Sequence, residues 1–269
     1  MSDKQLSAVT WWGEFTIPLG SVGRWRIGPA ILWIERLRNE WRSVYEVDEE
    51  ALETTVDITI PEVPPEEHAS NAIINRFGIN KTGDTLQLLP ALADRPVVIQ
   101  SELPFNILPK QSVTYYVSSP LWIQIKTIDP AVLMLDIPLY CPSDTWFGPS
   151  TMEGIISYAS KTHGRLSLEN ILFRPHRAIT VVLLRNQAEK PLLLKTLNLP
   201  VSHLSLYESE DGYLWTQPVV LELKNEDELS DLKLKERAPT EAKNPRLLCK
   251  PRESTKKNIL TKTLSHLIH

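Results

Sequence analysis

The chain has 269 residues, of which 42% are hydrophobic and 23% charged, and its formal net charge is −4. This composition is typical of a folded globular protein and excludes the disordered and fibrous classes. The charge is unevenly distributed, because residues 233–269 hold ten basic and three acidic groups, which makes this tail +7 and the preceding body −11. A body of that charge repels nucleic acid and anionic membranes, so we expect any such contact to be made by the tail.

The cysteine content and the distribution of apolar residues limit the compartment. Cys141 and Cys249 are the only cysteines, which excludes a disulfide framework or a cysteine-rich metal site and favours a reducing compartment. The first residues carry no secretory signal, and the longest uncharged stretch, residues 111–125, is interrupted by Pro120 and is too polar to span a bilayer. We therefore expect a cytoplasmic protein with no transmembrane segment, and we assign it no cofactor and no metal.

Residues 1–67 form the first predicted segment, a β-meander rich in tryptophan and arginine followed by an acidic connector. Its strand-like runs, separated by proline and glycine, cover residues 11–17, 22–28, 31–37 and 40–47. A helix over residues 30–42 is the alternative, because Ile31 and Ile34 have helical spacing. Nine acidic groups and no basic group lie between residues 46 and 67, with prolines that stiffen this connector.

Residues 68–224 are predicted to form the main body. Short apolar runs recur about every 8 to 12 residues with turn residues between them, which is typical of a β-sandwich or barrel. The runs cover residues 71–79, 86–89, 97–100, 112–117, 121–128, 132–137, 154–159, 179–186, 192–199, 204–208 and 215–223. The clearest hairpin turns at Asp211 and Gly212 between aromatic-bearing strands. The predicted fold is all-β, with a β-sandwich-like body built as one large or two small domains.

The tail is predicted in two parts. Residues 225–253 are polar, charged and interrupted by prolines, so we expect a linker that is mostly disordered. Residues 254–269 have the spacing of a short amphipathic helix that needs a surface to pack on. The residues predicted to contact a partner or a membrane are Lys256, Lys257, Ile259, Leu260, Lys262, Leu264, Leu267 and Ile268.

Motifs that carry chemistry are absent from the sequence. There is no phosphate-binding loop, dinucleotide fingerprint, zinc-protease motif or nucleophile elbow, so we name no catalytic residue. Two loops could form a ligand site: the stiff aromatic loop at residues 142–154 and the basic loop at residues 173–177. Its candidate residues are Asp144, Trp146, Glu153, Arg174, His176 and Arg177. The alternative interpretation, a self-packed loop and a solvated turn, is the one we favour.

Tryptophan and arginine alternate near the N-terminus. Five of the eight tryptophans lie in the first 41 residues, among five arginines. Such a surface can bind single-stranded nucleic acid or a glycan, but arginine stems packed on tryptophan would give the same pattern. The acidic segment that follows makes nucleic acid an unfavourable partner.

Six sequence motifs together resemble a known family. They are Trp12-Gly-Glu-Phe15, Leu32-Trp-Ile-Glu-Arg36, the stretch from Thr85 to Val98, Ser118-Ser-Pro-Leu-Trp122, Pro142-Ser-Asp-Thr-Trp-Phe-Gly-Pro149 and Arg174-Pro-His-Arg177. This set, which covers most of residues 10–223, resembles the prokaryotic family named domain of unknown function 432. The resemblance implies a bacterial or archaeal cytoplasmic origin and assigns no activity, substrate or catalytic residue.

Two functions are compatible with the sequence. The first is a non-enzymatic binding or scaffold protein that is attached through its basic tail. The tail would contact a protein partner, the chain's own acidic segment, a second copy of the chain, or an anionic membrane surface, and in the last case the protein would be peripheral to the inner membrane. The second is a protein that binds a small molecule or anion, or a hydrolase, with its site between loops 142–154 and 173–177. We favour a binding role over catalysis.

Overall fold

The computed structural model describes residues 10–64, 68–148, 153–223, 231–253 and 259–260. The chain forms two compact units. Unit 1 comprises Met1–Ala91, Leu121–Tyr140 and Arg174–His176, and unit 2 comprises Leu92–Pro120, Cys141–Phe173 and Arg177–His269. The described residues contain strands and two single-turn 3₁₀ helices, η1 (Leu168–Asn170) and η2 (Val201–His203), and no α-helix. The prediction of an all-β fold is confirmed.

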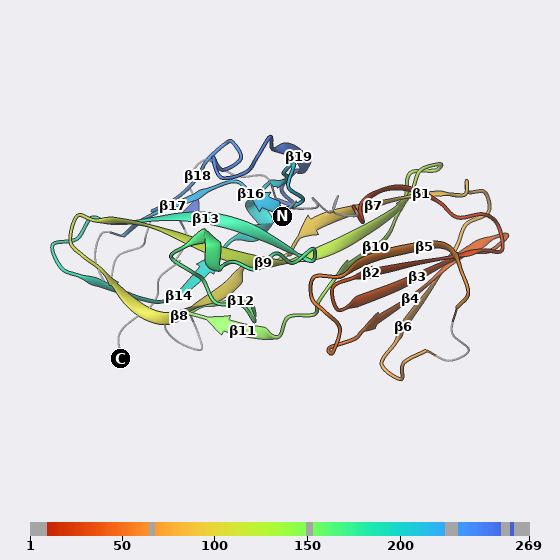
Figure 1. The fold of residues 1–269 in the computed structure, drawn as a ribbon, viewed down its shortest axis with the longest axis horizontal. Helices are drawn as coiled ribbons and strands as arrows, with labels where there is room; N and C mark the ends of the chain where they lie inside the picture. Colours follow the sequence, from red (N-terminus) through yellow and green to blue (C-terminus); the bar gives the residue numbers. More distant parts are fainter. Residues whose placement is uncertain (1–9, 65–67, 149–152, 224–230, 254–258, 261–269) are drawn as a thin grey trace, which may run out of the picture. The chain divides into compact units, whose positions relative to one another are not determined.

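A five-stranded antiparallel sheet forms one part of unit 1 (Figure 1), in the order β5-β2-β3-β4-β6. Its strands are β2 (Val22–Ile27), β3 (Ala30–Arg36), β4 (Glu40–Val47), β5 (Val56–Glu62) and β6 (Ile73–Gly78). Burial alternates along β3: Leu32 and Ile34 are 1% exposed, whereas Trp33 between them is half-buried. A period of two residues is that of a strand, so the alternative of a helix over residues 30–42 is wrong.

The tryptophans of unit 1 mostly serve its core. Trp11, Trp25 and Trp41 have no exposed surface, and the Trp25 ring meets Phe15 edge to face at 5.3 Å. The Arg36 guanidinium lies 5.1 Å from the centre of the Trp41 ring. Arginine stems packed on tryptophan therefore account for much of the pattern near the N-terminus, because three of the five rings cannot reach a ligand.

The remaining strands of unit 1 are β1 (Gly13–Thr16), β7 (Thr85–Leu92, whose last residue belongs to unit 2), the second half of β9 (Ser112–Thr127) and β10 (Leu133–Pro138). β1 pairs with β7, and β10 with β9, both antiparallel. The acidic segment before residue 68 is tied into this unit. Asp57 and Glu62 pair with Arg24, and Glu46 accepts a 2.7 Å hydrogen bond from His68.

Unit 2 is built from two sets of strands, which Figure 1 draws as separate layers. The first set, in the order β11-β12-β8-β14, comprises β11 (Asp144–Phe147), β12 (Ile155–Ala159), β8 (Val97–Ile107) and β14 (Leu192–Leu199). The second starts from the first half of β9, which pairs with β13 (Arg177–Asn186), and it branches there. One branch runs through β16 (Leu214–Thr216) and β15 (Leu206–Glu208) to β19 (Arg246–Cys249), and the other through β17 (Val219–Leu223) and β18 (Asp231–Leu234) to β20 (Ile259–Leu260). The predicted hairpin is confirmed as β15 and β16, and Gly212 in its turn has a φ of +83°.

Three stretches differ from the sequence prediction. Residues 142–154, predicted as a stiff aromatic loop, contain β11, whose four residues fit between Pro142 and Pro149. Residues 225–253, predicted as a disordered linker, contain β18 and β19, which pair with β17 and β15. The amphipathic helix over residues 254–269 is not shown: Ile259–Leu260 form the short strand β20 against β18, and the rest of the segment lies outside the described residues.

Candidate functional site

A pocket of about 600 Å³ opens on unit 2, and we call it the unit-2 pocket. It is lined by side chains from β9, the segment around η1, the β15–β16 hairpin and the segment before β19. The lining residues are Tyr116, Leu166, Ser167, Leu168, Glu169, Ile171, Asp211, Tyr213, Trp215, Glu241 and Lys243. They come from four separate stretches of chain, so only the folded unit brings them together.

The floor of the pocket is a small hydrophobic cluster on one face of the sheet. Trp215 lies beside Ile179 of β13, and Val181 lies opposite Tyr116 of β9. Residues directly opposite each other in a sheet project from the same face, so these four side chains form one surface. Trp215 is 2% exposed, and Tyr213 packs partly buried against the same cluster.

Three carboxylates stand around this aromatic floor, and two of them have partners within the pocket. Asp211 accepts a hydrogen bond from the Ser209 hydroxyl, and its Oδ2 lies 3.9 Å from Nζ of Lys243. Glu241 accepts hydrogen bonds from the Tyr116 hydroxyl at 3.3 Å and from the Thr240 hydroxyl at 3.2 Å.

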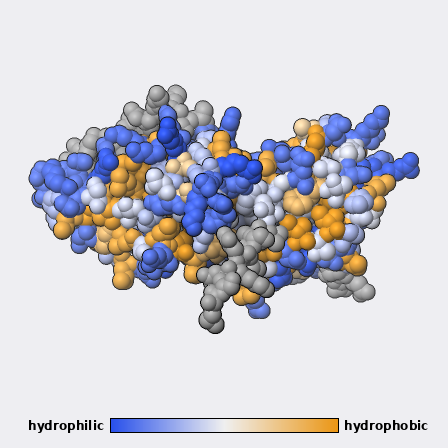
Figure 2. Space-filling model, turned by 45° about the horizontal axis from the view of Figure 1, so that its top comes forward, coloured by the Kyte–Doolittle hydropathy of each residue, from blue (hydrophilic) through white to orange (hydrophobic). Residues whose placement is uncertain are grey.

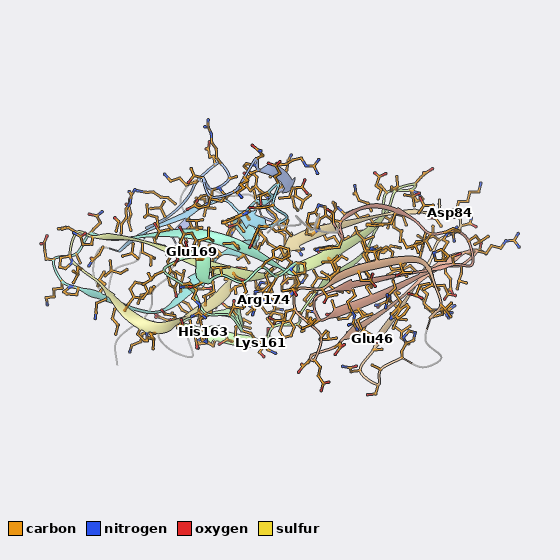
Figure 3. The ribbon with its side chains drawn as sticks, in the orientation of Figure 1. Glu46, Asp84, Lys161, His163, Glu169 and Arg174 are labelled. Carbon is orange, nitrogen blue, oxygen red and sulfur yellow. The ribbon has the colours of Figure 1, made fainter. Side chains whose placement is uncertain are left out.

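The third carboxylate, Glu169, belongs to η1 and is exposed (Figure 3). Among the residues that the structure describes, it has no hydrogen bond and no ion pair. With Lys243 as the single basic side chain of the lining, the pocket carries a formal charge of −2.

Two polar groups of the floor donate their protons within the protein. Burial raises the pKa of the Tyr116 phenol, and the nearby charge of Glu241 raises it further. Tyr116 is protonated at neutral pH and donates to Glu241. The indole Nε1 of Trp215 donates to the Ser209 hydroxyl at 3.0 Å. Among the described residues the Tyr213 hydroxyl has no such partner, so it is the donor of the floor that stays available to a ligand.

Backbone and side-chain contacts hold the walls of the pocket. The backbone N–H of Glu210 donates to the carbonyl of Lys243 at 2.9 Å, and the Asn244 amide donates to the Glu210 carboxylate at 2.6 Å. Next to the η1 segment, Arg165 and Tyr116 exchange two backbone hydrogen bonds of 2.8 Å. The Phe173 ring packs edge to face on Tyr213 at 4.9 Å. These links fix the hairpin turn, the segment before β19 and the η1 segment around the opening.

The candidate residues of loop 142–154 lie in unit 2 and outside this pocket. Asp144 is in β11, where its Oδ1 accepts a 3.2 Å hydrogen bond from Arg95. Trp146 is 46% exposed on the same strand, opposite Ile156 of β12, and Glu153 is exposed just before that strand. On the face seen in Figure 2, apolar residues gather in several separate patches.

The candidate residues of loop 173–177 are divided between the units. In unit 1, Nε of Arg174 lies 2.5 Å from the Glu53 carboxylate, and His176 is 2% exposed beside Gly28. In unit 2, Arg177 is 6% exposed and donates hydrogen bonds to Ser118, Ser160 and Thr162. A single ligand site made by both loops stays a prediction.

The candidate contact residues of the tail lie outside the described residues, except Ile259 and Leu260 in β20. Their contact with a protein partner or an anionic membrane stays a prediction as well. Within the part of the chain that the structure describes, no helix is long and apolar enough to cross a membrane. No group of three or more histidine, cysteine, aspartate or glutamate side chains there has an arrangement that could hold a metal ion.

Sequence reasoning did not find the unit-2 pocket. The sequence pattern predicts a hairpin that contains Tyr213 and Trp215, and a linker that contains Glu241 and Lys243. The one feature of the sequence that could have indicated a binding site is the Asp-Gly turn, because it is flanked by both aromatic and acidic residues. It could not reveal that residues 166–171 and 241–243 stand beside that turn.

Comparison with known proteins gives a family and no activity. No curated protein and no solved structure matches the chain. Residues 11–269 match the family described as "Protein of unknown function (DUF432)", which covers nearly the whole chain and includes every lining residue of the unit-2 pocket. The chain therefore belongs to the DUF432 family.

Proposed function

We propose that this protein acts by binding a small molecule in the unit-2 pocket. The observation that carries the proposal is the pocket itself: a space of about 600 Å³ over an aromatic floor, bordered by charged side chains. Pockets for small ligands are typically about 300 to 1,000 Å³ and combine apolar walls with a few polar groups. The unit-2 pocket fits both criteria.

The rigidity of the walls supports binding rather than a chance surface depression. A preformed site loses little conformational entropy when it takes a ligand, so more of the contact energy appears as affinity. Three elements of this site are tied by hydrogen bonds: the hairpin turn at Glu210, the segment at Lys243 and Asn244, and the η1 segment through Arg165. The proposal therefore places a ready-made site on unit 2.

The test is a thermal-melting screen of the full chain with small cations, anions, sugars and nucleotides. A ligand at one hundred times its dissociation constant stabilises the folded state by about 2.7 kcal/mol, enough for a clear rise in melting temperature. Ser167→Tyr should abolish that rise by filling the pocket, because Ser167 lines the pocket and its side chain makes no capping hydrogen bond to η1.

Ser112→Tyr is the matched control, since Ser112 is exposed at the start of β9 and away from the pocket lining. It should leave the ligand effect unchanged. The proposal fails if no compound raises the melting temperature, or if Ser167→Tyr and Ser112→Tyr respond to the compound equally.

A further inference from the structure

We infer that the ligand of the unit-2 pocket is an organic cation carrying an alkylammonium group. This inference rests on the proposed function and names the class of ligand. It follows from the charge of the lining, from the groups that remain available to a ligand, and from the aromatic floor.

The charge of the lining favours a cation. Glu169, Asp211 and Glu241 oppose the single positive charge of Lys243, and that ammonium is already placed 3.9 Å from Asp211. An anionic ligand would meet three carboxylates with one compensating group. A cationic ligand would find in Glu169 a carboxylate that has no partner among the described residues.

The available hydrogen-bonding groups point the same way. The Tyr116 hydroxyl donates to Glu241, and the Trp215 indole donates to Ser209, so neither is free to bind an oxygen of a ligand. The donors that remain in the lining are the hydroxyls of Ser167 and Tyr213 and the ammonium of Lys243. The three carboxylates each keep acceptor capacity, because an ionised carboxylate has about four lone-pair sites. The lining therefore offers more acceptors than donors, which suits a ligand that donates or carries positive charge.

The aromatic floor supplies the second half of a cation site. Tyr116 and Tyr213 are half-buried and line the pocket, and an alkylammonium group over such rings is attracted by their π electrons. Trp215 is buried beneath them, with its ring centre 6.2 Å from that of Tyr213 and the two planes at 45°, so it supports the Tyr213 ring from below.

A neutral sugar is the strongest competing ligand, because sugars also stack on aromatic rings and donate hydroxyl protons to carboxylates. A neutral sugar could donate a hydroxyl proton to Glu169, but it would gain no charge–charge attraction from that carboxylate. Its affinity would therefore not depend on ionic strength. The charge dependence of binding therefore separates the two classes.

The experiment is calorimetric titration of the full chain with choline, with putrescine and with the neutral isostere of choline in which a tert-butyl group replaces the trimethylammonium group. We expect choline to bind at least about fivefold more tightly than its isostere. Raising the salt concentration from about 0.02 M to about 0.5 M should weaken choline and leave the isostere unchanged, because the Debye length shortens across this range.

Two variants of the lining should move choline affinity in opposite directions. Glu169→Gln removes the free carboxylate and should weaken choline about fivefold, which corresponds to about 1 kcal/mol. Lys243→Gln removes the competing ammonium and releases Asp211, so it should strengthen choline about two- to fivefold. Glu236→Gln is the matched control, because Glu236 is exposed and outside the lining, and it should change nothing.

Equal binding of choline and its isostere, with no response to Glu169→Gln, overturns the inference and leaves the proposed function standing. If neither choline nor putrescine binds, the inference is overturned as well. The proposed function would still stand if a compound of another class raises the melting temperature and Ser167→Tyr abolishes that rise. Absence of any hit in that screen would remove both.

Discussion

Replacing Arg177 tests whether this arginine holds unit 2 together or binds an anion. Arg177 is 6% exposed, and its guanidinium donates to the hydroxyl and the carbonyl of Ser118, both at 2.6 Å, to the Ser160 hydroxyl at 2.9 Å and to the Thr162 hydroxyl at 2.8 Å. These contacts join β13 to β9 and to the segment after β12. Arg177→Met keeps much of the side-chain volume and removes all four.

The expected cost is smaller than the number of hydrogen bonds suggests. Each hydrogen bond to a charged group contributes about 1.5 to 3 kcal/mol, but removing the arginine also removes the cost of burying its charge. The hydroxyls of Ser160 and Thr162 already lie 3.1 Å apart, at 3.4 and 3.1 Å from the Ser118 carbonyl, so they can satisfy one another. We expect Arg177→Met to lower the free energy of unfolding by about 2 to 4 kcal/mol.

Urea unfolding of the full chain, followed by circular dichroism, measures this loss. Arg185→Met is the matched control on the same strand: Arg185 is 39% exposed and lies 3.5 Å from Glu222, a surface ion pair that contributes at most about 1 kcal/mol. If Arg177→Met unfolds within about 0.5 kcal/mol of the wild type and loses affinity for phosphate or sulfate, the structural role is refuted and the anion-binding role is supported.

Three further predictions concern stability. Asn186→Asp should lower the free energy of unfolding by about 4 kcal/mol or more, because it places a carboxylate against the carbonyls of Ile107, Leu108 and Lys190. In urea unfolding this loss should exceed that of Asn186→Ala, which removes the amide without adding a charge. Gly28→Ala should cost about 2 to 4 kcal/mol in the same assay, since Gly28 has a φ of +56° and a Cβ there overlaps His176, whereas Gly83→Ala should be neutral because nothing lies within 4 Å. Burial first, then the hydrogen bond to Asp94, raises the pKa of Tyr158 to about 12. As the pH rises, the unfolded chain therefore loses this proton before the folded chain does. The free energy of unfolding that Tyr158 contributes is fully present below pH 10 and should fall by about 1 to 2 kcal/mol towards pH 12, whereas Tyr158→Phe should not show this fall.

Local patterns predicted the strands of unit 1 from short apolar runs bounded by glycine and proline. In β3, Leu32 and Ile34 face the core and Trp33 is half-buried, but the apolar residues of this run are consecutive, so the sequence also allowed a helix there. The β15–β16 hairpin was clearer, because its Asp-Gly turn requires the positive φ that Gly212 adopts. In both cases the signal is contained within a few consecutive residues.

Composition misled the prediction where charged residues lie on a short strand near the edge of a sheet. In β18, Leu232 is 2% exposed while Lys233 points outward, a short alternation hidden by the charge of the surrounding segment. Charged residues on outer strands are common because they prevent edge-to-edge pairing. A run of lysines and glutamates is therefore compatible with a strand as well as with a linker.

The pocket could not be predicted because its parts are distant in sequence and each part has an ordinary local explanation. Tyr116 belongs to a regular strand, Glu169 to a single helical turn and Glu241 to a polar loop. Their combined chemistry arises only from the sheet register that sets Tyr116 beside Val181, and Ile179 beside Trp215.

Part of the basic charge of the tail is paired within unit 2. Lys233 pairs with Glu222 at 2.9 Å, Arg246 with Glu208, and Lys243 approaches Asp211 at 3.9 Å, so these three basic residues meet carboxylates of β15, β17 and the hairpin turn. Ending the chain at residue 224 would therefore remove three paired strands and two lining residues of the pocket along with the tail. Attachment through the tail is better tested by Lys256→Glu and Lys257→Glu in the full chain, because these changes alter its charge and leave β18 and β19 in place.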